Sequence, residues 1–296
     1  MTKIILLLTV GLLLRFFSVA QNYPSYYLLC NKADSLQFIG QKEAAFRTYN
    51  QAFQMVSFVH TKKLQNAYLL AIELHEYNAA FDLGRLIIRN SGQPDLIKVK
   101  NRRFKQSSCY QTLKDSSAYY LEIYHNRINH DFVALIDSLI FIDQYIIRGN
   151  KTYKAAYQIN LTSLPLNLFD LDSSNWQLLY SSIQKWGFPS EENVGYEANQ
   201  KVWAILHHNL RLIENEKYHA EIFNFVESGA YLPEDLVVWY EQFQQQNYNQ
   251  TYFTTWDGNL STENLARIEN NLRRFYLKGL CAYELRKGGR YMIAKW

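Results

Sequence analysis

Two polar residues on otherwise apolar helix faces are the strongest candidates for chemistry in this chain. Asp143 falls on the same predicted helical stripe as Ile136 and Leu139, and His208 falls beside Ile205. A carboxylate and an imidazole that met in such surroundings would form an acid–base pair with divergent pKa values, as a hydrolase requires. The alternatives are a structural ion pair or hydrogen bond for the carboxylate and a satisfied core position for the histidine.

Six further residues are candidates for ligand binding. An arginine can clamp an anion, and the aromatic rings in the polar stretch 247–260 could stack on a carbohydrate or a peptide. The same rings could instead pack onto the last helix. The six candidates are Gln144, Arg148, Tyr252, Trp256, Arg273 and Arg274.

The sequence completes no catalytic, nucleotide-binding or metal-binding motif. It contains no G-x-S-x-G turn of a serine hydrolase, no G-x-x-x-x-G-K-[ST] phosphate loop and no H-E-x-x-H pair. Cys30, Cys109 and Cys281 lack metal-site spacing such as C-x-x-C. We therefore expect no metal and no cofactor. The thiols are expected to be free and buried, although export would permit a disulfide.

Composition favours long helices and does not indicate a nucleic-acid partner. The chain has 48% hydrophobic residues but only 12 Gly and 5 Pro among 296 residues, so strong turn formers are too few for an all-β fold. Its formal charge is only +4, whereas nucleic-acid binding calls for a marked basic face. One basic run, Lys98 to Lys105, is predicted to be a solvated face, with a contact for an acidic partner as the alternative.

Residues 1–20 have the features of a cleaved signal peptide. Lys3 precedes an apolar run from Ile4 to Leu14, and Ser18-Val19-Ala20 supplies small residues before a cut. The run is shorter than the ~20 residues of a membrane span, which disfavours the alternative of an uncleaved anchor. We expect an exported protein, periplasmic or extracellular, with no transmembrane span after signal removal.

An internal repeat predicts helical hairpins in the first half of the chain. Ala33 and Ala67 lie 34 residues apart, and the blocks Glu43–Phe46 and Asn78–Phe81 match at an interval of 35. Such spacing resembles degenerate tetratricopeptide repeats, in which alanine lets paired helices approach closely. Two repeats need a neighbour to be stable. The predicted helices are 24–39, 42–57, 61–75 and 77–90, and Gly92 ends the last.

Apolar residues at three-to-four spacing predict further helices downstream. One is capped by Ser173 or Ser174 and ends at Gly187. The predicted fold is all-α, with a signal peptide at 1–20, a repeat domain with a basic connector at 21–128 and a second helical domain at 129–296. The other helices are predicted over 115–127, 132–146, 196–214, 216–228 and 233–246, and a last helix follows Ser261.

The second half resembles an uncharacterised bacterial domain of unknown function. The resemblance rests on the order of Asp143-Gln144 with Arg148, then Gly187-Phe188-Pro189, Val194-Gly195 and a helix carrying His208. That family carries D-Q-x-x-R, G-x-P, V-G and Q-H signatures and often follows tetratricopeptide-like helices in exported proteins. The resemblance implies this architecture and no particular reaction, because the family has no established activity.

These features favour a protein- or ligand-binding module of the cell envelope. The repeat half would present a concave groove, and no complete catalytic motif accompanies it. The rival is a hydrolase-like enzyme that uses Asp143 and His208, with Arg273 or Arg274 as the anion clamp. A third interpretation is a structural accessory of an envelope assembly. The expected partner is a protein or a small ligand.

Overall fold

The described part of the chain is helical. The computed structural model describes residues 21–147, 168–209 and 216–237, and within these ranges it contains helices and turns but no strand. The predicted all-α fold class is therefore confirmed. None of the described helices combines the length and apolar character needed to cross a bilayer. The predicted signal peptide, residues 1–20, lies outside the described residues.

Two helical hairpins open the described chain, close to the predicted bounds. Helix α2 (Tyr23–Phe38) packs on α3 (Lys42–Phe53), and α4 (Thr61–Glu73) packs on α5 (Tyr77–Ser91). The largest difference from the prediction is the end of α3, which comes four residues early. The alanines at the repeat interval sit at the helix contacts and are fully buried: Ala33, Ala45, Ala67 and Ala80.

The ends of these helices follow local chemistry. The side chain of Asn22 accepts a hydrogen bond from Ser25 N at the start of α2, where Pro24 occupies the first turn. Helix α5 ends at Gly92, whose φ of 71° is the left-handed conformation that glycine adopts readily. The predicted stop at this position is therefore correct.

The predicted connector is more helical than the sequence indicated. It contains η1 (Pro94–Ile97), α6 (Arg102–Lys105), α7 (Ser108–Asp115) and α8 (Ser117–Arg127), so helix begins well before residue 115. The reason is packing, because Phe104 and Leu113 are fully buried beside α4 and α5. The basic residues of the run from Lys98 to Lys105 are exposed, as predicted.

Beyond α8, the described residues contain five further α-helices, one π-helical turn and a short helical segment at residues 233–237. The helix α11 begins at Leu168, so Ser173 and Ser174 lie inside it and cap nothing; that prediction was wrong. The apolar residues of Leu168–Leu171 continue the helical spacing upstream of both serines. The elements are α9 (His130–Phe141), η2 (Ile142–Ile147), α11 (Leu168–Trp186), α12 (Glu191–Val194), α13 (Tyr196–His208) and α14 (Glu216–Glu227).

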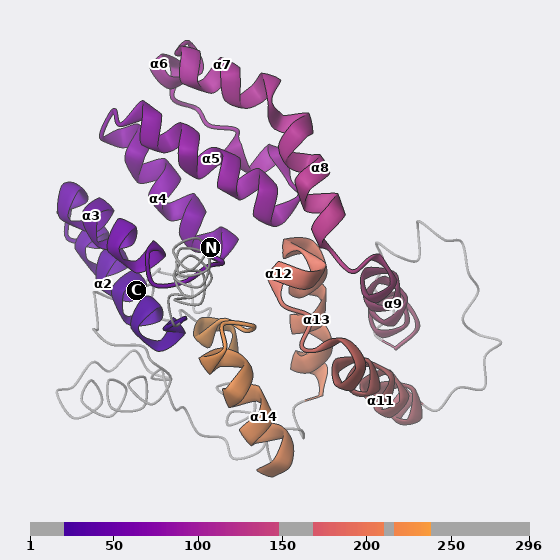
Figure 1. Ribbon diagram of the computed structural model, residues 1–296. Helices are drawn as coiled ribbons and strands as arrows, with labels where there is room; N and C mark the ends of the chain where they lie inside the picture. The colour runs from indigo at the N-terminus through magenta and orange to yellow at the C-terminus, as the bar shows by residue number, and fades with distance from the viewer. Residues whose placement is uncertain (1–20, 148–167, 210–215, 238–296) are drawn as a thin grey trace, which may run out of the picture.

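The described helices follow a curved path that returns to its start (Figure 1). Helices α2 to α8 form one side, α9 to α13 continue from them, and α14 packs against α2. The hydroxyl of Tyr27 on α2 donates to the carbonyls of Val226 and Tyr231, at 3.0 and 3.2 Å. A single buried core runs through the described helices of both halves.

A second junction joins the halves through one tyrosine. The ring of Tyr124 on α8 lies against Gly92 at the end of α5 and Gly195 at the start of α13, so closely that a Cβ on either glycine would overlap it. Both glycines have positive φ, 71° and 82°. The ring therefore occupies a slot that only glycine can leave open.

Candidate functional site

Polar side chains from four parts of the chain meet at the start of α4. We call this set the α4 cluster; it consists of Asp34, His60, Thr61, Lys63, Glu191 and Glu234. All six residues are at least nine-tenths buried. Asp34 comes from α2, Glu191 from α12, and Glu234 from the helical turn that begins at Pro233. The cluster thus lies where the two ends of the curved path meet.

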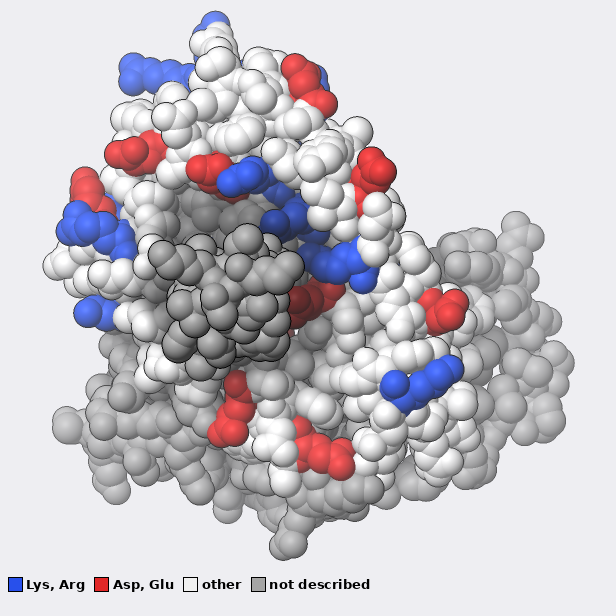
Figure 2. All heavy atoms as spheres, in the orientation of Figure 1, with Lys and Arg blue, Asp and Glu red and all other residues white. Residues whose placement is uncertain are grey.

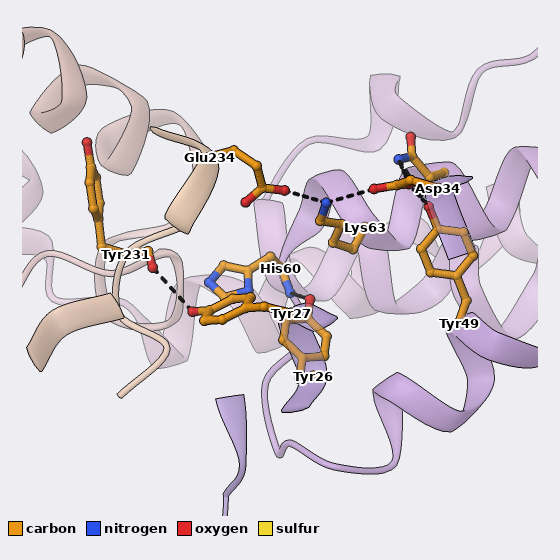
Figure 3. A network of polar contacts seen from close by, with 9 residues as sticks. Tyr26, Tyr27, Asp34, Tyr49, His60, Lys63, Tyr231 and Glu234 are labelled. Carbon is orange, nitrogen blue, oxygen red and sulfur yellow. Dashed lines mark hydrogen bonds and ion pairs between the residues drawn. The ribbon is translucent and has the colours of Figure 1, made fainter. Parts of the chain in front are cut away.

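Lys63 is the centre of the cluster (Figure 3). Its ammonium lies 3.0 Å from Asp34 Oδ2 and also forms an ion pair with Glu234. Burial opposes the charge of Lys63, but the two carboxylates outweigh it and raise the pKa of the amine well above its ordinary value. Burial would likewise raise the pKa of Glu234, yet Lys63 together with Lys62 lowers it to about 2. The amine of Lys63 and the carboxylate of Glu234 are therefore both charged at neutral pH.

Neutral donors hold the Asp34 end of this ion pair. The hydroxyl of Tyr49 donates to Asp34 Oδ1, and Asn66 Nδ2 donates to the same oxygen at 3.1 Å. Burial, followed by the adjacent Asp34 charge, raises the pKa of the Tyr49 hydroxyl, so it remains a donor. Each carboxylate oxygen of Asp34 thus has a buried donor, which lowers the cost of burying its charge.

His60 sits in an aromatic cage beside the ion pair. Its ring stacks on Tyr26, with centroids 5.8 Å apart, and also contacts Tyr23, Tyr27 and Phe58. Burial, reinforced by Lys63, lowers the pKa of His60 to about 4, so the ring is neutral at pH 7. Its Nε2 lies 3.0 Å from the carbonyl of Gly229, and in the neutral ring this nitrogen donates.

Glu191 caps α4 from a distance of 130 residues. Its Oε2 accepts a hydrogen bond of 2.8 Å from Thr61 N, one of the amides that a helix start leaves unsatisfied. His60, the residue in the N-cap position, makes no side-chain cap bond of its own. Burial raises the pKa of Glu191 to about 7, although the hydrogen bonds from Thr61 and the charge of Arg127 oppose the shift.

The α4 cluster has the chemistry of a structural junction. The amine is charged and held by two carboxylates, the imidazole is neutral, and all of them are shielded from solvent. A general base or nucleophile must reach a substrate, and these groups instead bind one another. No group of three or more His, Cys, Asp or Glu side chains in the described ranges could hold a metal ion.

Mild acidification should stabilise the protein, and Glu191 should be a main cause. Glu191 has a pKa of about 7 in the folded protein, against an ordinary value of 4.5, so the folded state binds its proton more tightly than the unfolded state does. The stabilisation that this proton gives the folded state is complete below pH 4.5 and is lost as the pH rises through 7. Asp235, whose pKa burial raises from 3.8 to about 6, acts in the same direction. His60 opposes them, because its stabilisation is complete above pH 6.5 and is lost as pH falls through about 4.

Glu191 and Asp235 act in one direction and His60 in the other, so the free energy of unfolding should rise by roughly 1 kcal/mol for each pH unit of acidification between about pH 6 and 5. The change Glu191→Gln should remove that slope while keeping an acceptor for Thr61 N. Urea unfolding at several pH values measures it. Glu192→Gln, at the exposed neighbour, is the control and should keep the wild-type slope. An unchanged slope in Glu191→Gln would contradict the assignment.

Of the two predicted catalytic residues, the structure describes the side chain of Asp143 but not that of His208. Asp143 lies in the π-helical turn and is 1% exposed, and its Oδ2 accepts a hydrogen bond of 2.6 Å from Gln144 Nε2. His208 is the last residue of α13, and its side chain falls outside the described residues. The remaining predicted binding residues also lie outside them: Arg148, Tyr252, Trp256, Arg273 and Arg274.

The sequence analysis missed the α4 cluster, although one signal was present. Lys63 lies one helical turn before Ala67, on the face that the repeat pattern turns inward. A lysine there requires a buried anion, and Asp34 stands next to the repeat alanine Ala33. Nothing in the sequence identified Glu191 or Glu234 as the other members, because pairing across more than 100 residues leaves no local pattern.

Two of the three cysteines are described, and both are free. Cys30 is buried, and burial raises the pKa of its thiol, as expected for an inert core thiol. Cys109 is partly buried, and its thiol donates to Asn78 Oδ1 at 3.3 Å. Cys281 lies outside the described residues.

Comparison with known proteins identified no relative of this chain. No family model matches the chain, and neither the curated proteins nor the solved structures that were searched contain a match.

Proposed function

We propose that this chain is an exported binding module with tetratricopeptide-like hairpins, which recognises another protein through exposed apolar side chains. The observation that carries the proposal is a group of such side chains at one end of the two hairpins. Phe38, Ile39 and Leu69 are 47%, 56% and 48% exposed. Phe38 and Ile39 end α2, while Leu69 lies on the outer side of α4. We call these three residues the apolar end.

An ion pair places the two parts of the apolar end close together. Lys42 Nζ at the start of α3 lies 3.2 Å from Glu73 Oε2 at the end of α4. Phe38 and Ile39 precede Lys42 by three or four residues, and Leu69 precedes Glu73 by one helical turn. Apolar side chains that gather beside a polar rim are typical of protein contact sites.

The buried chemistry of the described part supports the same conclusion. The ionisable groups of the α4 cluster are engaged with one another, and the described hydrogen bond of Asp143 comes from its neighbour Gln144. These groups serve to hold the helices in place. A rigid helical scaffold with an exposed apolar end supports recognition better than catalysis.

The double change Phe38→Glu with Leu69→Glu should abolish binding to the protein partner. The test uses chemical cross-linking of the purified full chain to an envelope extract, followed by identification and reconstitution with the purified partner. Charges placed in an apolar contact should weaken binding by at least about 100-fold, because two well-placed contact residues contribute several kcal/mol.

The control is Leu178→Glu, which charges an equally exposed leucine on α11, remote in sequence from the hairpins. It should bind like the wild type. Helical circular dichroism should be unchanged in both variants, since none of the three positions is buried. Equal affinity of the double variant and the wild type would overturn the proposal.

A further inference from the structure

The strongest concentration of charge in the described chain lies on residues 95–105, which we call the basic segment. It contains five basic residues and one acidic residue, a net charge of +4, whereas the whole of residues 21–296 carries only +2. The rest of that chain is therefore slightly acidic. All five basic residues are exposed: Lys98, Lys100, Arg102, Arg103 and Lys105.

Apolar anchors fix the basic segment on the protein. Ile97 is 4% exposed, and its carbonyl accepts a hydrogen bond of 2.8 Å from the hydroxyl of Tyr68. Phe104 is fully buried against Tyr68, Tyr77 and Tyr110. Because these anchors point inward, the cations between them are presented outward from a fixed backbone.

Most of these charges have no counter-charge in the protein. Lys98 pairs with Asp95 at 2.7 Å, but Lys100, Arg102, Arg103 and Lys105 form no ion pair with any described residue. Arg85 pairs with Asp82, and Lys201 pairs with Asp137 and Glu197. Exposed cations such as Lys32 and Arg47 also lack a described partner, but they stand alone, whereas the basic segment places four unpaired cations within residues 100–105. The basic segment thus retains a local field that an external anion would neutralise.

The position of the segment fits a broad surface. Helices α6 and α7 form an outer edge of the molecule, on the far side from α14 (Figure 1), and Lys and Arg side chains project from that edge (Figure 2). A projecting edge can lie on an extended plane with all its cations in reach of it. Phosphate headgroups of a bilayer supply such a plane, and clusters of exposed Lys and Arg bind them electrostatically.

We propose that the basic segment docks this protein on a bilayer surface rich in anionic phospholipid headgroups. The contact is peripheral and reversible. It uses residues other than those of the apolar end, which takes a protein partner. Because the interaction is electrostatic, it should weaken as the salt concentration rises.

Vesicle co-sedimentation of the purified full chain tests the proposal. Wild-type protein should bind phosphatidylglycerol vesicles and not phosphatidylcholine vesicles. The variant with Lys100, Arg102, Arg103 and Lys105 each changed to Gln should bind at least about 100-fold more weakly, given the contribution of each basic side chain at an anionic surface. Residues 1–20 are the same in every protein compared, so a difference in vesicle binding between the variants is due to the basic segment.

The matched control removes four exposed charges elsewhere, through Lys32, Lys42, Arg47 and Lys185 changed to Gln. It has the same net charge as the test variant and should retain binding within about threefold of the wild type, as expected if the local cluster determines contact. Equal loss in both variants, or no vesicle binding by the wild type, would overturn the proposal. Full competition by inorganic phosphate would also overturn it, because that result would indicate a site for the free ion. Binding to polyglutamate without binding to vesicles would overturn it as well.

Discussion

Replacing Lys63 with methionine should lower the free energy of unfolding by about 3–5 kcal/mol, because it removes one partner from a buried ion pair. The change leaves the carboxylates of Asp34 and Glu234 buried without the cation between them. Methionine fills much of the same volume, so the loss reports charge more than packing. Urea denaturation monitored by circular dichroism measures it.

Lys42→Met is the matched control, since Lys42 pairs with Glu73 in a bridge whose side chains are about half exposed, 48% and 50%. Exposed pairs of this kind contribute less than about 1 kcal/mol. Adding Glu234→Gln to Lys63→Met should restore part of the lost stability by removing one uncompensated charge. If Lys63→Met costs no more than Lys42→Met, the α4 cluster does not hold the two halves together.

Gly229→Ala should be the most harmful small substitution among the described glycines with positive φ. Gly229 has a φ of 80°, and an added Cβ would overlap the ring of Tyr23. Tyr23 is 2% exposed and packs on Tyr27 and His60, so its ring has little room to move. Backbone strain and overpacking together should cost about 3 kcal/mol in unfolding free energy.

Gly187→Ala separates the two contributions. Gly187 has nearly the same φ, 79°, but a Cβ there meets no atom within 4 Å. This variant should lose only the strain, about 1–2 kcal/mol. Thermal denaturation of both proteins gives the comparison, and equal losses would mean that the Tyr23 ring yields to the new methyl group.

The hairpins at 23–91 were the most predictable part of the fold, for local reasons. Recurrent alanines, apolar spacing and Gly92 gave helix bounds that agree with α2, α4 and α5 to within two residues. The predicted helix bounds were wrong where a helix depends on contacts with residues distant in the sequence. The short helix α6 forms around Phe104, whose partners Tyr68 and Tyr77 lie about 30 residues upstream.

The candidate site was predicted less well than the fold. Asp143 was expected to be buried on account of helical spacing, and it is. The α4 cluster was not foreseen, because its members Lys63, Glu191 and Glu234 come from segments that only the closure of the path brings together. Single-sequence patterns identify a helix face, but they do not state which distant face covers it.

The closure also bears on when the protein can fold. Tyr27 reaches Val226 and Tyr231 across 199 and 204 positions, and His60 reaches Gly229 across 169. Contacts this far apart in sequence form late, since the entropy of closing a long loop is lost before the contact is gained. A nascent chain that lacks its last quarter has Lys63 without Glu234 and His60 without its acceptor. Such a chain would lack the contacts that close the path, so the closed fold can form only after residue 234 has been synthesised.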